Sequence, residues 1–230
     1  MQIYGIQKTT LLDYPGKVAA TIFTPGCNFR CPYCYNIPLA ESDINTGYLS
    51  EDEVFAFLAK RKGILDGICI SGGEPTLQKD LAGFISRVKE YGYSVKLDTN
   101  GTSPKTLKEL IDRELLDYIA MDIKSSLSGY AAVSGVINPD TGAVKKSIEI
   151  LMEKRIPFEF RTTVIKQYHD KRAFDEIGEL IRGADPYYLQ SFEDNENVTD
   201  HSLCACTKEE LQAFALQLSK YGVNAIIRGR

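Results

Sequence analysis

Short apolar runs alternate with amphipathic stretches along nearly the whole chain of 230 residues. The apolar runs have the length of buried strands, and the stretches between them repeat their apolar residues with the period of a helix. This alternation predicts successive βα units and a parallel sheet. The predicted strands are 18–23, 67–71, 95–98, 118–123, 158–164 and 187–192, with a further candidate strand at 224–227.

The predicted helices fall between these strands. Ser50 and Glu53 are spaced as a capping box, and Thr207 and Glu210 repeat that spacing, so each pair predicts a helix start. The Pro that follows Ser103 suits the first turn of another helix. The predicted helices are 51–62, 80–91, a helix from 104, 143–154, 172–182 and a helix from 207.

Six βα units, two fewer than a complete barrel, predict an open, partial (βα)6 TIM-like barrel with its helices outside a parallel sheet. No linker or low-complexity stretch divides the chain, so we expect a single domain over residues 1–230. Its core is expected at about 17–192, and 193–230 is expected to hold a polar loop, a helix and the candidate last strand. The polar segment 193–206 is expected to be the most mobile loop.

Composition and charge narrow the classes of partner and compartment. The formal net charge is −4 and the sequence pI is about 5.4. No cluster of Lys or Arg is present, so we expect no nucleic-acid partner. No run of about 18 apolar residues is present either, so we expect no membrane span. Six cysteines without a signal-peptide pattern argue against a disulfide framework and favour a reducing cytoplasm.

Three of the six cysteines, Cys27, Cys31 and Cys34, lie within eight residues, directly after the first predicted strand. Parallel α/β folds carry their chemistry at this end of the strands. Iron–sulfur clusters usually have four Cys ligands, so three thiolates would leave one iron of a cubic cluster without a protein ligand. An open coordination position is typical of a metal site that does chemistry, by the logic established for zinc.

Two other interpretations of these cysteines stay open from the residues alone. One is a zinc site built from Cys31 and Cys34 with two distant ligands, although a second Cys-x-x-Cys is missing. The other is a redox-active dithiol. Neither gives Cys27 a role. The remaining cysteines and histidines are expected to be a core thiol (Cys69), loop or packed thiols (Cys204 and Cys206) and loop residues (His169 and His201).

Polar strings follow three more predicted strands. In Ser71–Pro75 two glycines allow a backbone to approach a ligand, and a carboxylate can accept hydrogen bonds from an ammonium. In 98–101 the carboxylate of Asp98 can accept from a ribose hydroxyl. Asp122 and Lys124 alternate to one face of their strand. The structural alternatives are a strand-ending turn, an Asn-Gly turn and an ion pair, respectively.

The motifs carry a resemblance to a known family. The string Cys-x-x-x-Cys-x-aromatic-Cys resembles the signature of the radical S-adenosylmethionine (radical SAM) superfamily, and Ser71–Pro75 is similar to its Gly-Gly-Glu motif. The strings at 98–101 and 121–124 together resemble those of the activating enzymes of glycyl radical enzymes. Further similarity, to the anaerobic ribonucleoside-triphosphate reductase activating protein group, lies in 7–17, 24–28 and 73–78.

The resemblance implies a barrel of the radical SAM type, with a [4Fe–4S] cluster on Cys27, Cys31 and Cys34 and SAM at the open iron. It implies that one electron from a flavodoxin or ferredoxin cleaves SAM to methionine and a 5′-deoxyadenosyl radical. This radical would remove the α-hydrogen of a glycine in a glycyl radical enzyme, either the anaerobic ribonucleotide reductase, which the strings favour, or another member of that class. An open barrel with a wide mouth is expected to admit the peptide that carries this glycine. The residues expected to contact SAM are Tyr33, Tyr35, Gly72, Gly73, Glu74, Asp98, Asp122, Lys124, Arg161 and Gln190.

One residue departs from the family, because many members carry His where this chain has Tyr35. Two alternatives to glycyl radical activation are a radical SAM enzyme that acts on a small molecule or another protein, and a non-catalytic metal-binding or electron-transfer protein. The first predicts SAM cleavage without a glycyl radical, and the second predicts a fully ligated metal and no SAM cleavage.

Overall fold

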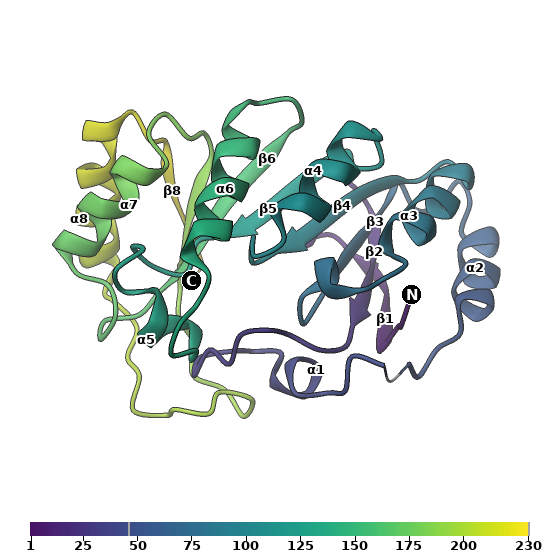
Figure 1. The fold of residues 1–230 in the computed structure, drawn as a ribbon, viewed down its shortest axis with the longest axis horizontal. Helices are drawn as coiled ribbons and strands as arrows, with labels where there is room; N and C mark the ends of the chain where they lie inside the picture. Colours follow the sequence, from purple (N-terminus) through teal and green to yellow (C-terminus); the bar gives the residue numbers. More distant parts are fainter. Residues whose placement is uncertain (46, 230) are drawn as a thin grey trace.

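The computed structural model describes residues 1–45 and 47–229, and its framework is one sheet whose strands follow chain order from β1 to β8 (Figure 1). β1 (Gly5–Thr10) pairs antiparallel with β2 (Ala19–Thr24), and every later pair is parallel. The later strands are β3 (Gly67–Gly72), β4 (Ser94–Thr99), β5 (Tyr118–Asp122), β6 (Phe158–Val164), β7 (Tyr187–Ser191) and β8 (Ala225–Arg228).

Helices cover the outer face of the sheet (Figure 1). In chain order they are α1 (Ile37–Ala40), α2 (Glu51–Lys60), α3 (Leu81–Glu90), α4 (Pro104–Asp112), α5 (Tyr130–Ser134), α6 (Thr141–Met152), α7 (Lys171–Leu180) and α8 (Lys208–Leu218). Two 3₁₀ turns, η1 (Pro75–Leu77) and η2 (Ser219–Tyr221), complete the described elements. All seven predicted strands and six predicted helices are present, which confirms the open α/β fold.

Local sequence signals account for several of these elements. The capping box that begins α2 is formed, because Glu53 N–H donates to the Ser50 hydroxyl and Ser50 N–H donates to the Glu53 carboxylate. Pro104 occupies the first turn of α4. The apolar runs of the strands are buried, with Ile68 and Ile70 of β3 fully inaccessible to solvent. A single cluster of buried side chains extends from Ile3 to Val223.

One strand, two short α-helices and the two 3₁₀ turns were not predicted. β1 carries exposed Gln7, Lys8 and Thr9, so it lacks the apolar run by which the other strands were recognised. It is an edge strand, and its ladder to β2 is interrupted between Gln7 and Thr10. α1 and α5 have four and five residues, which is too short to show a helical period.

The segment 193–206, expected from its polar composition to be the most mobile loop, packs two apolar side chains against the barrel. Val198 and Leu203 are buried, with 2% and 6% of their surface exposed. Its far end is tied to the residues after β6, because Lys166 N–H donates to the Cys204 carbonyl at 3.0 Å. The segment is polar by composition, yet two apolar residues fix it to the barrel.

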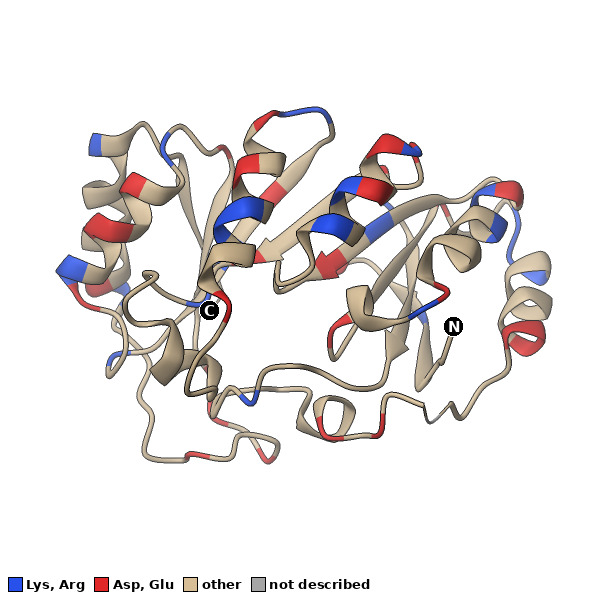
Figure 2. Ribbon diagram, in the orientation of Figure 1, with Lys and Arg blue, Asp and Glu red and all other residues tan. Residues whose placement is uncertain are grey.

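The outer helices show both signs of charge side by side in the view of Figure 2. Exposed pairs one helical turn apart contribute to this mixture, such as Lys108 with Asp112 and Arg113 with Glu109. Within residues 1–45 and 47–229, none of the helices combines the length and the apolar character that crossing a membrane requires.

Candidate functional site

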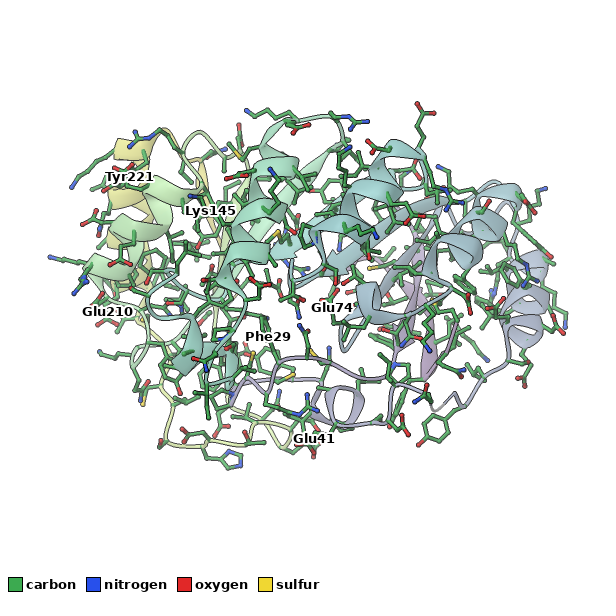
Figure 3. The ribbon with its side chains drawn as sticks, in the orientation of Figure 1. Phe29, Glu41, Glu74, Lys145, Glu210 and Tyr221 are labelled. Carbon is green, nitrogen blue, oxygen red and sulfur yellow. The ribbon has the colours of Figure 1, made fainter. Side chains whose placement is uncertain are left out.

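A cavity of about 520 Å³ runs along the ends of the parallel strands. Figure 3 shows Phe29 and Glu74 near the middle of the molecule; both line this cavity, one from the cysteine loop and one from the turn after β3. Every residue that the sequence predicted for the site lines the cavity: Cys27, Cys31, Tyr33, Cys34, Tyr35, Gly72, Gly73, Glu74, Asp98, Asp122, Lys124, Arg161 and Gln190. The convergence follows from topology, because parallel strands end at the same edge of a sheet.

The cysteine loop, residues 25–36, leaves β2 without regular structure and is held by more distant segments. Cys27 N–H donates to the Ala40 carbonyl at 3.2 Å, and Arg30 N–H donates to the Ser134 carbonyl at 2.8 Å. Gly135 ends α5 with φ +68°, and a Cβ there would lie 2.0 Å from the Arg30 carbonyl oxygen. Only glycine fits this approach.

The three cysteines form no disulfide bond and line the cavity. Burial raises the pKa of the Cys27 thiol to about 11 and also raises the pKa of Cys31. In the metal-free protein these two thiols are therefore protonated near neutral pH, and metal binding has to displace their protons.

The arrangement of donors suits a cluster better than a single ion. In the described part of the chain, no three His, Cys, Asp or Glu side chains converge on a point that one metal ion could occupy. A cubic cluster takes each thiolate on a different iron. Cys27, Cys31 and Cys34 all line this one cavity, so the residues present fit a [4Fe–4S] cluster.

The other potential ligands of a zinc site are engaged elsewhere. Ile165 N–H donates to Nδ1 of buried His169 at 3.0 Å. Its Nε2 lies 2.9 Å from the Lys124 carbonyl oxygen. His201 is exposed and pairs with Asp194 at 2.8 Å. Cys206 is packed in the core, and both histidines lie in loops as expected, although His169 is buried there.

Gly72 and Gly73 serve close packing between two backbones. A Cβ on Gly73 would lie 2.0 Å from the Gly26 carbonyl oxygen, and one on Gly72 would lie 2.4 Å from Thr24 N. Gly72 also has φ +122°, which side chains rarely allow. The glycines therefore bring the turn after β3 against the start of the cysteine loop. From the sequence, approach to a ligand and a strand-ending turn were the two interpretations, and the contact with the cysteine loop was not predicted.

Glu74 is the residue whose geometry differs most from expectation. Its carboxylate is completely buried and accepts from the Thr99 hydroxyl at 2.7 Å and from Asn100 N–H at 2.6 Å. Thr76 N–H donates to the same carboxylate at 3.1 Å. Burial raises the pKa of Glu74, and these hydrogen bonds oppose the shift. The carboxylate thus ties the turn after β3 to the turn after β4, and most of its acceptor capacity is already used.

Four charged side chains on the cavity wall form one ionic group, and a fifth, Lys96, pairs with it from outside the cavity lining. Asp122 pairs with Lys124 and with Arg161 Nε, each at 2.9 Å. Arg161 also lies 3.6 Å from Asp98, which makes a further pair with buried Lys96. The strand register explains the contact between Asp122 and Arg161, since these residues are partners across β5 and β6.

The charges of this group stabilise one another. Burial alone would raise the pKa of Asp122, but Lys124 and Arg161 outweigh it and hold that pKa well below the usual range. The pKa of Asp98 is lowered in the same way against burial, by Arg161 and then Lys96. Asp122 in turn raises the pKa of Lys124 in spite of burial. Both carboxylates and both cations are therefore charged at neutral pH.

The aromatic residues beside the cysteines have different surroundings. Tyr33 is buried, its ring centre is 5.9 Å from the Lys124 ammonium, and its hydroxyl has no hydrogen-bond partner within the described residues. Tyr35 is 37% exposed, and its hydroxyl accepts from Glu193 N–H at 2.8 Å. Gln190 reaches the cavity from β7, where its register partner is Arg228 of β8.

Some cavity residues escaped the sequence reasoning. Arg228 pairs with buried Glu159 at 3.1 Å and lies 3.5 Å from the centre of the Tyr188 ring. Asn100 donates to the Asn28 side chain at 2.9 Å and lies 3.9 Å from the Cys27 sulfur. Glu159 itself does not line the cavity, although it is two residues before Arg161 on the same face of β6. Arg228 gave no signal, since only the fold places β8 beside β7.

Comparison with known proteins identifies a sequence family. The model of the radical SAM superfamily matches residues 21–180. A candidate glycyl-radical enzyme activating enzyme of Methanocaldococcus jannaschii is 34% identical over 98% of this chain and 95% of its own length. A GTP 3′,8-cyclase of Helicobacter pylori is 32% identical over 87% of this chain, which spans 62% of that protein.

A solved structure shares the fold. A domain of a pyruvate-formate lyase-activating enzyme from Bacteroides vulgatus superposes with a TM-score of 0.57 at 22% identity. The overlap covers 71% of this chain and 99% of that domain.

Proposed function

This chain belongs to the radical SAM superfamily, and we propose that it activates a glycyl radical enzyme by removing an α-hydrogen from one of that partner's glycines. The family resemblance seen in the motifs is confirmed, and the chain is an enzyme whose cofactors are a [4Fe–4S] cluster and SAM. The observation that supports the proposal most is one cavity lined by all three thiols of the cysteine loop and by every residue predicted to contact SAM.

In this proposal, different cavity residues bind the cluster and SAM. With both bound, one-electron reduction supplies a 5′-deoxyadenosyl radical from SAM. Cys27, Cys31 and Cys34 are the cluster ligands in this proposal. Asp98 accepts a hydrogen bond from a ribose hydroxyl, and Lys124 donates to an anionic group of SAM.

Two other residues are positioning residues in this proposal. The guanidinium of Arg161 is already shared by Asp98 and Asp122, so it orients these carboxylates instead of binding SAM itself. Glu74 similarly fixes the turns after β3 and β4, which leaves contact with the SAM ammonium to the backbone of the Gly72–Gly73 turn.

The partner and the electron source are further parts of the proposal. The motifs favour anaerobic ribonucleoside-triphosphate reductase as the glycyl radical enzyme. A glycine lacks a side chain, so a loop that carries it can enter a narrow site. A flavodoxin or ferredoxin in the cytoplasm would supply the electron, since such clusters need a low-potential donor.

The test is a glycyl radical signal by electron paramagnetic resonance. Anaerobically reconstituted protein is mixed with SAM, dithionite and each candidate glycyl radical enzyme, and release of 5′-deoxyadenosine is measured in parallel. We expect a glycyl radical with one partner only. Cys27→Ala should abolish both signals, whereas Cys204→Ala, which removes an exposed thiol outside the cavity, should preserve them. A protein that holds zinc alone, or that never cleaves SAM, would refute the proposal.

A second candidate is a radical SAM enzyme that acts on a small molecule. The similarity to a GTP 3′,8-cyclase favours it. It predicts steady 5′-deoxyadenosine release with a nucleotide substrate and no glycyl radical in any partner enzyme.

A further inference from the structure

Residues 192–206 form a strap that joins two ends of the barrel across the cysteine loop. The strap leaves the end of β7 and passes beside the cysteine loop, low in the view of Figure 1. It then returns to the end of β6, where Ala205 forms an isolated bridge with Ile165. Both ends of the strap are therefore attached to the sheet.

The middle of the strap binds one carbonyl of the cysteine loop. Thr199 N–H and Asp200 N–H donate to the Pro32 carbonyl at 3.1 and 3.2 Å, and the Thr199 hydroxyl donates to it at 3.1 Å. Pro32 directly follows Cys31. The strap thus fixes the peptide unit between two of the proposed cluster ligands.

The start of the strap binds Tyr35, which directly follows Cys34. The Tyr35 hydroxyl accepts from Glu193 N–H at 2.8 Å. The rings of Tyr35 and Phe192 are stacked, with an angle of 9° between their planes and 6.4 Å between their centres. The hydrogen bond between Tyr35 and Glu193 joins residues 158 positions apart in the chain, so no local sequence signal could predict it.

Apolar anchors keep the strap in place. Phe192 and Val198 are 3% and 2% exposed. On its other side the cysteine loop is held by the end of α5, through the hydrogen bond from Arg30 to Ser134. The cysteine loop has no regular structure of its own here, so its shape depends on these two distant supports.

We propose that Tyr35 and the strap position the cysteine loop and slow the loss of its cluster. The proposal rests on the proposed function, because it takes Cys27, Cys31 and Cys34 as the cluster ligands. Tyr35 acts through the loop and is a positioning residue. It holds the peptide after Cys34, while Thr199 and Asp200 hold the peptide after Cys31.

Two variants separate the contacts of Tyr35. Tyr35→Phe removes the hydrogen bond and keeps the stacked ring, and Tyr35→Ala removes both. Tyr48→Phe is the matched control, since Tyr48 is exposed and does not line the cavity. In the metal-free proteins, hydrogen exchange is followed by mass spectrometry in peptides covering 25–36, 192–206 and the sheet.

In reconstituted proteins, release of iron to a chelator is followed by absorbance under anaerobic conditions. We expect release about fivefold faster for Tyr35→Phe and faster still for Tyr35→Ala, in the range that the loss of one hydrogen bond and one aromatic contact allows. Exchange should rise in the cysteine loop and in the strap but not in the sheet, and Tyr48→Phe should behave as the unaltered protein.

Unchanged exchange and unchanged iron release in Tyr35→Ala would overturn the proposal. If Tyr35→Ala exchanges faster throughout the sheet, its fold is damaged. Unchanged exchange and unchanged iron release in Tyr35→Phe would then overturn the proposal. If the unaltered protein takes up no iron, the proposed function fails, while exchange in the metal-free variants still decides whether Tyr35 holds the loop.

Discussion

At the scale of single residues, two glycines let backbone segments touch where a side chain would separate them. Gly73 contacts the Gly26 carbonyl and Gly135 contacts the Arg30 carbonyl, so one supports the start of the cysteine loop and the other supports its middle. The shape of the cavity wall therefore depends on residues that offer no chemistry of their own.

Gly73→Ala should destabilise the protein by about 1–3 kcal/mol, because the new methyl group meets backbone that cannot yield easily. Gly83→Ala is the matched control. Gly83 lies in α3 with open space around it, so alanine should stabilise that helix by about 0.5–1 kcal/mol. Denaturant unfolding measures both changes, and equal effects would contradict the packing explanation.

Arg161→Met should cost about 1–3 kcal/mol, because it removes the cation shared by two partly buried carboxylates, each of which keeps one lysine partner. The comparison is Arg155→Met, which removes an exposed partner of Asp112 and should change stability little. Unfolding of the two variants at pH 7 gives the difference. A loss no larger for Arg161→Met than for Arg155→Met would show that the group is solvated.

At the scale of elements, helix starts follow local side-chain chemistry. Ser50→Ala should weaken α2 by about 1 kcal/mol, since the Ser50 hydroxyl accepts from Glu53 N–H. Asp80 occupies the same position of α3 but makes no capping hydrogen bond with its side chain, so Asp80→Ala should have a smaller effect. Thermal or denaturant unfolding would compare them, and equal losses would argue against the capping box.

Strand β1 forms because a neighbouring strand pairs with it. Its residues lack an apolar run, yet β2 offers a free edge with which they pair antiparallel. The strands β2 to β7 needed no such help, because apolar runs mark them in the sequence, whereas Ile226 of β8 is 39% exposed.

At the scale of the whole molecule, the ionic group links stability to pH. The pKa values of Asp98 and Asp122 are lowered in the folded protein, against burial, by Arg161, Lys96 and Lys124. The unfolded chain therefore takes up protons first, near pH 3.9. The stability from these carboxylates is fully present above that pH and is lost as pH falls toward the folded pKa values.

We therefore expect the free energy of unfolding to fall on acidification below about pH 4, and Asp122→Asn should flatten this fall. Glu74 acts in the opposite direction, because burial raises its folded pKa and its contribution is lost as pH rises through that value. Urea unfolding between pH 2.5 and 7 is the measurement, at intervals of about half a unit. An equally steep acid limb in Asp122→Asn would rule out this origin.

The sequence by itself determined the parallel strands, most of the helices and many of the residues at the cavity. It could do so because apolar runs mark buried strands, and because polar motifs at the ends of parallel strands must converge at one edge of the sheet. Every predicted site residue does line the cavity, while the individual roles of those residues in binding SAM stay predictions.

Only the tertiary structure decided which partners these residues have. In the folded structure, the Glu74 carboxylate accepts hydrogen bonds from Thr99 and Asn100. Arg161 pairs with two carboxylates, and the Tyr35 hydroxyl accepts a hydrogen bond from the strap. The physical reason is separation along the chain: such contacts exist only after whole surfaces have packed, and no local pattern of apolar and polar residues encodes them.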